Sequence, residues 1–431
     1  MPDDESVGKP LPQPVKIFRV GGSVRDELLG RPHSDHDWVV VGATPELMTA
    51  SGYRPVGRDF PVFLHPETQD EYALARTERK EGTGYRGFAF FASPEVTLED
   101  DLARRDLTIN AMARAEDGTL VDPYGGQQDL AAGVLRHVSP AFAEDPLRVL
   151  RVARFAARFG FKVAAQTQLL LRKIVDSGEL QTLAPERVWQ ELSTGLGESM
   201  PSRMFEVLRS CGALAALLPE VDALFGVPQP AKYHPEIDTG VHVMQALDYA
   251  AGKGFALQVR YAVLTHDLGK AATPPAKWPA HHGHEAASVR LAQALSERLK
   301  VPVDCRELAR LVARWHGVVH RAHELTAAKW LDLLLAADAL RRPERLTQLV
   351  QACACDALSR PGAPDHYVPG TLAGEALRIA KDVDAGAIAA AALARAELRG
   401  SPAGSDAIAK AVRAARIGAL KRWRDARRVT S

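Results

Sequence analysis

The chain has 431 residues, more than one hydrophobic core usually organises, so about two to four domains are expected. Its 46% hydrophobic and 25% charged residues are typical of a soluble globular protein, and no apolar run approaches the roughly 18 residues that a membrane helix requires. A net charge of +1 gives no overall argument for a nucleic-acid partner, so any such partner must be inferred from local clusters.

The first 14 residues are acidic and contain four prolines. They have neither the basic flank nor the apolar segment of a secretory signal, so we expect residues 1–14 to be a disordered tail. The chain has four cysteines, too few and too scattered for a disulfide framework, at Cys211, Cys305, Cys353 and Cys355. We therefore expect reduced thiols and a cytoplasmic protein with no membrane partner. The sequence leaves the oligomeric state open between a monomer and a homodimer.

The N-terminal third alternates short strands with helical segments. Strands are predicted at Lys16–Val20 and Trp38–Val41, with two more at Phe60–Leu64 and Tyr72–Ala75. A helix, Ser23–Leu29, follows the pair Gly21-Gly22. From residue 146 onward Ala, Leu and Arg recur at helical spacing. The sequence thus predicts an α+β chain, with a small α/β head followed by an all-α body.

The strongest local signal is Gly21-Gly22-Ser23-Val24-Arg25-Asp26, followed by Asp35-His36-Asp37 at the start of a strand. Residues i and i+2 of an extended chain share a side, so Asp35 and Asp37 are predicted to hold one or two Mg²⁺ ions between them. His36 should then point away, and we assign it no role. Two glycines before a helix let backbone N–H groups approach phosphate oxygens, as nucleotidyl transfer with a bound triphosphate requires.

A row of arginines marks the first helix of the predicted body. Arg148, Arg151 and Arg154 are expected to face a triphosphate as fork-shaped donors, whereas Arg158 is expected to belong to a solvated basic face. Asp145 lies three residues before Arg148. Together they offer an acceptor and a donor fork, the groups that reading the edge of a base requires.

Six ordered motifs between about residues 16 and 151 closely resemble the class II tRNA nucleotidyltransferase and poly(A) polymerase family, and within it the multifunctional bacterial branch with an HD domain. The motifs are Val20–Asp26, Asp35–Trp38, Arg76–Arg79, Arg104–Ala111, Asp122–Gly126 and Glu144–Arg151. The resemblance extends to about residue 360. It implies a polymerase-β-like head, template-independent addition of CCA to the 3′ end of tRNA, and the substrates CTP and ATP.

The resemblance implies roles for single residues within these motifs. Asp35 and Asp37 match the catalytic Mg²⁺ ligands. The nucleotide-binding positions are matched by Gly22, Arg25, Arg105, Asp145, Arg148, Arg151 and Arg154, with Asp145 and Arg148 acting as the protein template for C and A. The glycine-punctuated stretch from Arg79 to Gly87 matches a flexible loop implicated in switching from C to A addition, although an ordinary surface loop remains the alternative.

A second set of residues gathers metal-binding side chains between residues 242 and 356. The run Thr265–Lys270 resembles the HD phosphohydrolase superfamily. Carried over, that resemblance makes His242, His266, Asp267 and perhaps Asp356 the metal ligands, with His284 and His316 as possible additional ligands or phosphate contacts. It implies Ni²⁺ or another divalent transition metal and 2′,3′-cyclic phosphodiesterase, 2′-nucleotidase and phosphatase activities. His320 and His323 are expected to be ordinary histidines.

The resemblance and the composition together suggest a division of the chain. We expect a nucleotidyltransferase head at 15–138, a helical nucleotide-recognition and neck region at 139–226, an HD domain at 227–360 and a tRNA-binding helical tail at 361–431. The tail carries the basic cluster Lys421–Arg428, which includes one aromatic residue and is suited to phosphate contacts or base stacking, and a solvated tail is an equal alternative. Two other functions stay open: a poly(A) polymerase of the same superfamily, and a non-catalytic RNA-binding or nucleotide-sensing protein.

Overall fold

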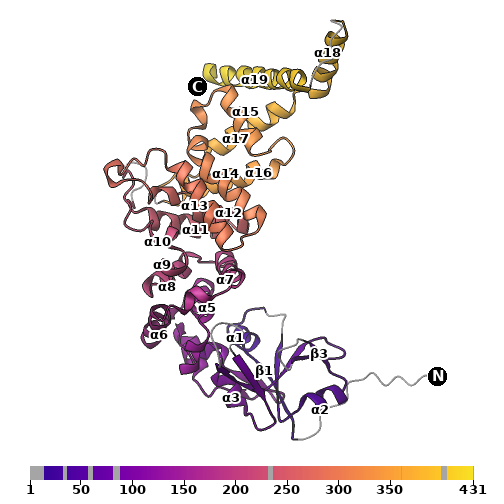
Figure 1. The fold of residues 1–431 in the computed structure, drawn as a ribbon, viewed down its shortest axis with the longest axis vertical. Coiled ribbons are helices and arrows are strands. Elements are labelled where there is room, and N and C mark those ends of the chain that lie inside the picture. Colours follow the sequence, from indigo (N-terminus) through magenta and orange to yellow (C-terminus); the bar gives the residue numbers. More distant parts are fainter. Residues whose placement is uncertain are drawn as a thin grey trace, which may run out of the picture. The chain divides into compact units, whose positions relative to one another are not determined.

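The computed structural model describes residues 14–32, 36–56, 62–80, 88–231, 236–360, 362–398 and 405–430. The chain divides into two compact units, Met1–Gly195 with Arg203–Leu217, and Leu196–Ser202 with Leu218–Ser431. Their elements are shown in Figure 1. Most of the predicted tail 1–14 lies outside the described residues. Within the described ranges no helix is both long enough and apolar enough to span a membrane.

The first unit is built on a seven-stranded mixed sheet with the order β3-β4-β5-β2-β1-β8-β9. Its strands are β1 (Lys16–Val20), β2 (Asp37–Val41), β3 (Arg54–Val56), β4 (Val62–Leu64), β5 (Glu71–Leu74), β8 (Ala113–Ala115) and β9 (Leu120–Val121). The helices around the sheet are α1 (Gly22–Leu28), α2 (Pro45–Ala50), α3 (Leu98–Ala103), η2 (Thr108–Asn110) and α4 (Gly126–Ala132). The four strands and the helix predicted from the sequence are all present, and their bounds agree with the prediction within two residues.

Alternation along β2 fills both faces of this sheet. Val39 packs with Leu102 of α3 in one buried cluster, whereas the next residue, Val40, packs with Met48 of α2 in another. β1 and β2 are antiparallel, and Val20 at the end of β1 pairs with Asp37 at the start of β2. The sheet therefore places Asp37 beside the turn that leads into α1.

The head also contains a second, two-stranded sheet that was not predicted. β6 (Arg76–Lys80) pairs antiparallel with β7 (Phe88–Ala92). Most of the loop predicted at Arg79–Gly87 lies outside the described residues, but its first two residues, Arg79 and Lys80, belong to β6. The prediction of a loop was wrong for these two residues, because ladder pairing with a strand further along the chain overrides their charged, glycine-flanked context.

The helical part of the first unit follows the head. Its elements are β10 (Val134–Leu135), η3 (Pro140–Glu144), α5 (Leu147–Phe159), β11 (Lys162–Val163), α6 (Ala165–Asp176), η4 (Glu179–Thr182), α7 (Pro185–Gly197), α8 (Ser202–Ser210) and α9 (Ala213–Leu217). Helix α5 buries Val149, Val152 and Ala156 at helical spacing and ends at Gly160, which has a φ of 71°. Its arginines are therefore directed to the side opposite this apolar stripe.

The described residues of the second unit form helices and no β-strand, apart from an isolated bridge between Pro228 and Asp238. The unit contains α10 (Pro219–Asp222), α11 (Thr239–Gly252), α12 (Leu257–Thr265), η5 (Leu268–Lys270), η6 (Pro275–Lys277), α13 (His284–Arg298), α14 (Val303–His320), η7 (Ala322–Glu324), α15 (Ala327–Ala336), α16 (Pro343–Leu358), α17 (Val368–Lys381), α18 (Ala385–Leu398) and α19 (Ser405–Thr430). Helices α11, α12, α14 and α16 pack against one another, and α13 packs on α14. The predicted α+β class, a small α/β head followed by a helical body, is confirmed.

Candidate functional site

A cavity of about 470 Å³ in the first unit brings the predicted nucleotide-binding residues together. It is lined by Gly21, Gly22, Arg25, Asp37, Arg104, Arg105, Asp106, Asn110, Asp145, Leu147, Arg148, Arg151, Arg154, Phe155, Arg158 and Arg187. Arginines clearly outnumber acidic residues in this lining. The predicted metal ligand Asp35 lies outside the described residues. A polar cavity rich in guanidinium groups suits a highly charged anion.

The turn after β1 needs glycine for two reasons. Gly21 has a φ of 72°, a backbone conformation that other L residues rarely adopt. A Cβ atom on Gly21 would lie 2.8 Å from Nη1 of Arg105 and 3.9 Å from Oδ2 of Asp37. The bare backbone thus lets an arginine and a carboxylate approach the start of α1. The His36 ring lies 6.3 Å from that of Trp38. Residues 36 and 38 share the side of the strand opposite to that of Asp37, which is the orientation predicted for His36.

Arg25 is buried in the wall of the cavity. Its Nη1 donates to Oδ1 of Asn110 at 2.5 Å and its Nε donates to Oδ1 of Asp26 at 2.8 Å. The guanidinium also lies 4.9 Å from the centre of the Phe159 ring. Burial lowers the pKa of Arg25, although its contacts with Asp26 oppose that effect. Arg25 is therefore held rigidly between two parts of the first unit.

Asp106 is one of several cavity residues to which the sequence interpretation assigned no role. Its Oδ1 accepts from Nδ2 of Asn110 at 2.9 Å and from the backbone N–H of Leu107 at 2.8 Å, and its Oδ2 accepts from Nε of Arg151 at 2.9 Å. Burial raises the pKa of Asp106, but Arg151 and Asn110 outweigh burial and lower it to about 2. The sequence feature that could have indicated Asp106 is the run Arg104–Asp106, where a carboxylate follows two arginines.

Helix α5 presents its arginines to the cavity as predicted. Nε of Arg154 donates to Oε2 of Glu191 on α7 at 2.6 Å, and Nη1 of Arg151 lies 3.7 Å from Oε1 of the same residue. The expectation for Arg158 was wrong. Its Nη2 donates to Oδ2 of the buried Asp26 at 2.9 Å, and Arg158 lines the same cavity. The error arose because Asp26 is 132 residues away in the chain.

Asp145 and Arg148 share a wall of the cavity. Oδ1 of Asp145 accepts from the backbone N–H of Leu147 at 3.0 Å, and Oδ2 lies 3.5 Å from Nη2 of Arg187. Arg148 donates to the carbonyl oxygens of Ala141 at 3.2 Å and Arg104 at 2.6 Å. Backbone contacts therefore fix the directions of both side chains.

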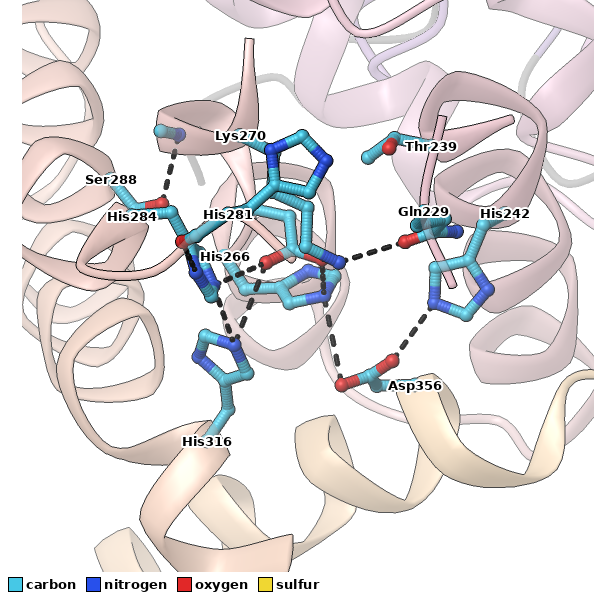
Figure 2. A network of polar contacts seen from close by, with 12 residues as sticks. Gln229, Thr239, His242, His266, Lys270, His281, His284, Ser288, His316 and Asp356 are labelled. Carbon is cyan, nitrogen blue, oxygen red and sulfur yellow. Dashed lines mark hydrogen bonds and ion pairs between the residues drawn. The ribbon is translucent and has the colours of Figure 1, made fainter. Parts of the chain in front are cut away.

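The second unit contains the predicted cluster of histidines and aspartates (Figure 2). His242 lies on α11, His266 and Asp267 follow α12, His284 begins α13, His316 lies on α14 and Asp356 lies near the end of α16. All but His284 are buried. The chain thus brings together all six predicted residues, which come from helices far apart in sequence.

Three of these residues form one group of candidate ligands. Each of His242, His266 and Asp356 offers one ligand atom, and these three atoms lie within 4.8 Å of one another. His242 Nε2 lies 2.8 Å from Oδ1 of Asp356, and its Nδ1 lies 2.8 Å from Oε1 of Glu236. Burial lowers the pKa of His242, but these two carboxylates outweigh burial and raise it to about 9. A site that favours a positive charge so strongly, built from imidazoles and carboxylates, fits a divalent transition metal.

Asp267 lies between this group and the other histidines. Its Oδ2 lies 3.1 Å from Nε2 of His266 and 2.7 Å from Nζ of Lys270. Lys270 in turn donates to Oε1 of Gln229 at 2.8 Å. Burial raises the pKa of Asp267, but His266 and Lys270 outweigh burial and keep that pKa well below its usual range. Contacts with His266 and Lys270 thus hold the Asp267 carboxylate in place.

Two further histidines were expected to be ordinary. His323 is largely exposed, and its nearest charged partner is Glu324 at 3.5 Å. His320 is hydrogen-bonded, but its partner is a candidate ligand: Nε2 lies 2.7 Å from Oδ2 of Asp356, and Nδ1 lies 2.9 Å from the hydroxyl of Tyr367. The sequence interpretation missed this chain of contacts because Asp356 lies on a different helix from His320, and Tyr367 directly precedes a third helix, α17.

The basic C-terminal cluster lies on α19. Its aromatic residue, Trp423, packs edge-on against Trp330 with ring centres 6.0 Å apart, and its Nε1 donates to Oε2 of Glu375 at 3.0 Å. The Trp423 ring is therefore part of the packing of α15, α17 and α19. This packing gives no support to base stacking by Trp423, whereas Lys421 and Arg422 are exposed.

Comparison with known proteins identifies related families. Residues 17–136 match the family described as the poly A polymerase head domain. Residues 160–225 match that described as a probable RNA and SrmB-binding site of polymerase A. The chain is 24% identical to a Bacillus stearothermophilus CCA-adding enzyme solved in complex with CTP, with a TM-score of 0.64 over 97% of this chain and 94% of that one. A Thermotoga maritima CCA-adding enzyme complexed with tRNA gives a TM-score of 0.59 at 20% identity over 94% and 87% of the two chains.

Relatives of much higher identity span nearly the whole chain. A protein of Nitrosomonas europaea named multifunctional CCA protein is 64% identical over 87% of this chain and 91% of its own length. The multifunctional CCA protein of Dechloromonas aromatica is 59% identical over 95% of this chain and 98% of its own length. Identity of this extent, together with the head-domain match and the shared fold, shows that the chain belongs to the multifunctional CCA protein family.

Proposed function

We propose that the chain adds and repairs the 3′-terminal CCA of tRNA, using CTP and ATP. The observation that carries this proposal is the cavity in which Asp37 meets the glycine turn of α1 and a wall of arginines. The name shared by the close relatives supports it. The related CCA-adding enzymes solved with CTP, with ATP and with tRNA are consistent with these substrates.

Asp35 and Asp37 would hold Mg²⁺ in this site. When bound, Mg²⁺ lowers the pKa of the attacking 3′-hydroxyl and neutralises the triphosphate and the departing pyrophosphate. The residues proposed to bind the triphosphate share backbone N–H groups or guanidinium forks directed at the cavity: Gly22, Arg25, Arg105, Arg151 and Arg154. Their fixed partners reduce the reorganisation that binding requires.

Asp145 and Arg148 would select the base. C and A each carry an exocyclic amine beside a ring nitrogen, so one carboxylate acceptor and one guanidinium donor serve either base. U and G present the opposite pattern. Support comes from the position of both side chains in the cavity wall, where backbone contacts fix them.

Substitution of the metal ligands tests the transferase proposal. Asp37→Ala, and likewise Asp35→Ala, should abolish incorporation of both CMP and AMP while leaving the fold and the affinity for tRNA nearly intact. A matched control is Asp176→Ala, at an exposed position that ends α6. Incorporation of labelled nucleotide into a tRNA that lacks CCA is the measurement. Normal turnover by Asp37→Ala in Mg²⁺ would refute the assignment.

We also propose a metal-dependent phosphohydrolase site in the second unit, acting as a 2′,3′-cyclic phosphodiesterase, 2′-nucleotidase and phosphatase. Its support is the convergence of His242, His266, Asp267 and Asp356 in the core of the unit. These residues would hold Ni²⁺ or another divalent transition metal, which supplies a hydroxide for attack on phosphorus. Each of these three activities hydrolyses a P–O bond at a terminal ribose or a terminal phosphate.

Separate substitutions distinguish the two activities. His266→Ala or Asp267→Ala should remove Ni²⁺-dependent hydrolysis of 2′,3′-cyclic AMP and spare CCA addition, because the two sites belong to different compact units. His323→Ala, at an exposed histidine, is the control. Loss of both activities in a variant that circular dichroism shows to be folded would contradict the assignment of two sites.

For the organisation of the chain we propose a head at 15–138, a neck at 139–226, an HD domain at 227–360 and a tRNA-binding tail at 361–431. The exposed basic side chains of α19 support the last of these. A poly(A) polymerase activity would show itself as incorporation from ATP alone with none from CTP alone. A non-catalytic RNA-binding protein would incorporate neither nucleotide.

A further inference from the structure

We propose that Phe155 and Phe159 of α5 are positioning residues for the triphosphate. The faces of their rings hold the arginines of the cavity in place and leave the N–H groups of those arginines for phosphate oxygens. This inference rests on the nucleotide transfer proposed above. It adds to the site two residues that carry neither a charge nor a hydrogen-bonding side chain.

The two rings form a stacked pair inside the first unit. Phe155 and Phe159 are one helical turn apart on α5, so their side chains lie on the same side of the helix. The ring centres are 5.9 Å apart, and the ring planes differ by 8°. Both side chains are buried, and Phe155 lines the cavity. The pair is therefore a packed support in the cavity wall.

Three arginines of the cavity lie close to the Phe155 ring. Cζ of Arg154 lies 4.6 Å from the ring centre, Cζ of Arg25 lies 5.4 Å from it, and Cζ of Arg151 lies 5.7 Å from it. A cation within about 6 Å of a ring centre is attracted by the negative face of the ring. Phe155 therefore attracts three of the groups proposed to bind the triphosphate.

The Phe159 ring extends this support to the other side of the cavity. Arg25 lies over this ring as well, with Cζ 4.9 Å from its centre. Cζ of Arg31 lies 4.9 Å from the same centre and Cζ of Arg158 lies 5.1 Å from it. Arg158 lines the cavity, and Arg25 is shared by the two rings. The stacked pair thus links arginines that come from α1 and from α5.

A ring face stabilises a gathered set of arginines in a way that a carboxylate does not. Guanidinium groups in one cavity repel one another, and a carboxylate that offsets this repulsion occupies N–H groups. Asp106, for example, contacts two nitrogens of Arg151, Nε at 2.9 Å and Nη2 at 2.8 Å. The donors of a guanidinium lie in its plane, so attraction to the π electrons of a ring occupies none of them.

Arg154 shows the consequence of this division most clearly. Its Nε donates to Oε2 of Glu191 at 2.6 Å, and its Cζ lies over the Phe155 ring. Among the residues that the structure describes, its two Nη atoms have no hydrogen-bond acceptor. The side chain is 12% exposed and lines the cavity. Its terminal N–H groups are therefore held in place and available for two phosphate oxygens.

The arginine proposed to read the base lies over a different ring. Cζ of Arg148 lies 5.8 Å from the centre of the Phe142 ring, outside the stacked pair. Changes at Phe155 should therefore weaken binding of the triphosphate and leave the choice of base unchanged. This expectation separates the positioning role of Phe155 from the selection proposed for Asp145 and Arg148.

Binding of inorganic tripolyphosphate tests the inference without relying on transfer. Isothermal titration calorimetry with Mg²⁺ compares the full wild-type chain with its variants. Phe155→Leu should weaken tripolyphosphate binding about tenfold, and Phe159→Leu should weaken it several-fold. Phe205→Leu is the matched control, because Phe205 is a buried phenylalanine on α8 that does not line the cavity, and its affinity should equal that of the wild-type chain.

Fluorinated rings separate the electrostatic role of Phe155 from its packing. Replacement of Phe155 by monofluoro-, difluoro- and trifluorophenylalanine withdraws π electrons stepwise from the ring face and changes its volume little. The Kd for tripolyphosphate and the KM for CTP and ATP should rise with each fluorine. The kcat and the preference between the four nucleotides should stay within about twofold of the wild-type values. A ring that only fills space would show no such trend.

The outcomes distinguish this inference from the proposed transfer. Equal tripolyphosphate affinity across the fluorinated series, in chains that circular dichroism shows to be folded, would overturn the role of the ring. A stepwise loss of that affinity without any incorporation of CMP or AMP by the wild-type chain would support the role of the ring and overturn the transfer. Failure of the wild-type chain to bind either tripolyphosphate or CTP would overturn both.

Discussion

Replacing Asp106 with Asn should destabilise the first unit by about 3 kcal/mol at neutral pH. Folding lowers the pKa of Asp106 from 3.8 to about 2, which corresponds to about 2 kcal/mol of stabilisation of the folded chain. Solvent screening reduces this contribution somewhat, because the side chain of its partner Arg151 is 35% exposed. An Asn also brings an amide N–H₂ against existing donors, whichever way it turns. Leaving such a buried donor unpaired costs about 1 to 3 kcal/mol.

The pH dependence has a defined sign. The folded pKa of Asp106 is depressed, so its contribution to stability is complete above the unfolded pKa of about 3.8 and is lost as the pH falls toward about 2. By pH 3 about half of that contribution should be gone. Asp106→Asn lacks this titration, so the difference in free energy of unfolding between the wild-type and variant proteins should become smaller as the pH falls.

Urea unfolding at pH 6 and pH 3 measures this prediction. Hydrogen-exchange mass spectrometry of peptides from residues 98–159 isolates the unfolding of the first unit from that of the second. Asp176→Asn, at an exposed position, is the control for substitution alone. Two results would refute a stabilising role for the Asp106 charge. One is a free energy of unfolding for Asp106→Asn within about 0.5 kcal/mol of the wild-type value at pH 6, and the other is an equally large difference between the two proteins at pH 3.

Three more predictions follow from single contacts. Asp145→Ala should slow use of CTP and ATP and relax discrimination against UTP and GTP by roughly 1 to 3 kcal/mol in competition kinetics; an unchanged preference would place selection in the loop 79–87 or in the RNA. Gly21→Ala should raise the KM for both nucleotides several-fold, because its Cβ would meet Arg105 at 2.8 Å and strain the turn, and an unchanged KM would contradict this. Tyr367→Phe removes the hydroxyl 2.9 Å from Nδ1 of His320 and should weaken Ni²⁺ binding about tenfold by calorimetry; unaltered affinity would mean that this contact does not position Asp356.

Local patterns predicted much of the first unit and its cavity. The spacing of Arg148, Arg151 and Arg154 defines one side of a helix, and the structure confirms that side. The glycine turn and the strand after it also follow from short stretches of sequence. In each case the informative residues lie within one element or two adjacent ones, where periodicity and backbone conformation decide the structure.

Contacts between distant residues could not be predicted in the same way. Arg158 was expected in solvent because nothing near it in sequence indicates Asp26 as its partner. The relation of His320 to Asp356 likewise depends on how α14 and α16 pack. The hairpin of β6 and β7 was missed because pairing across an intervening segment outweighs the local polarity of its first strand.

The product ladder from a tRNA that lacks its CCA end tests the central claim most directly. The full chain is supplied with Mg²⁺ and with CTP alone, ATP alone, or both. We predict extension by two C residues with CTP alone and completion to CCA only when both nucleotides are present, with both products lost in Asp37→Ala. A long homopolymer of A from ATP alone, or no extension under any of the three conditions, would contradict the account.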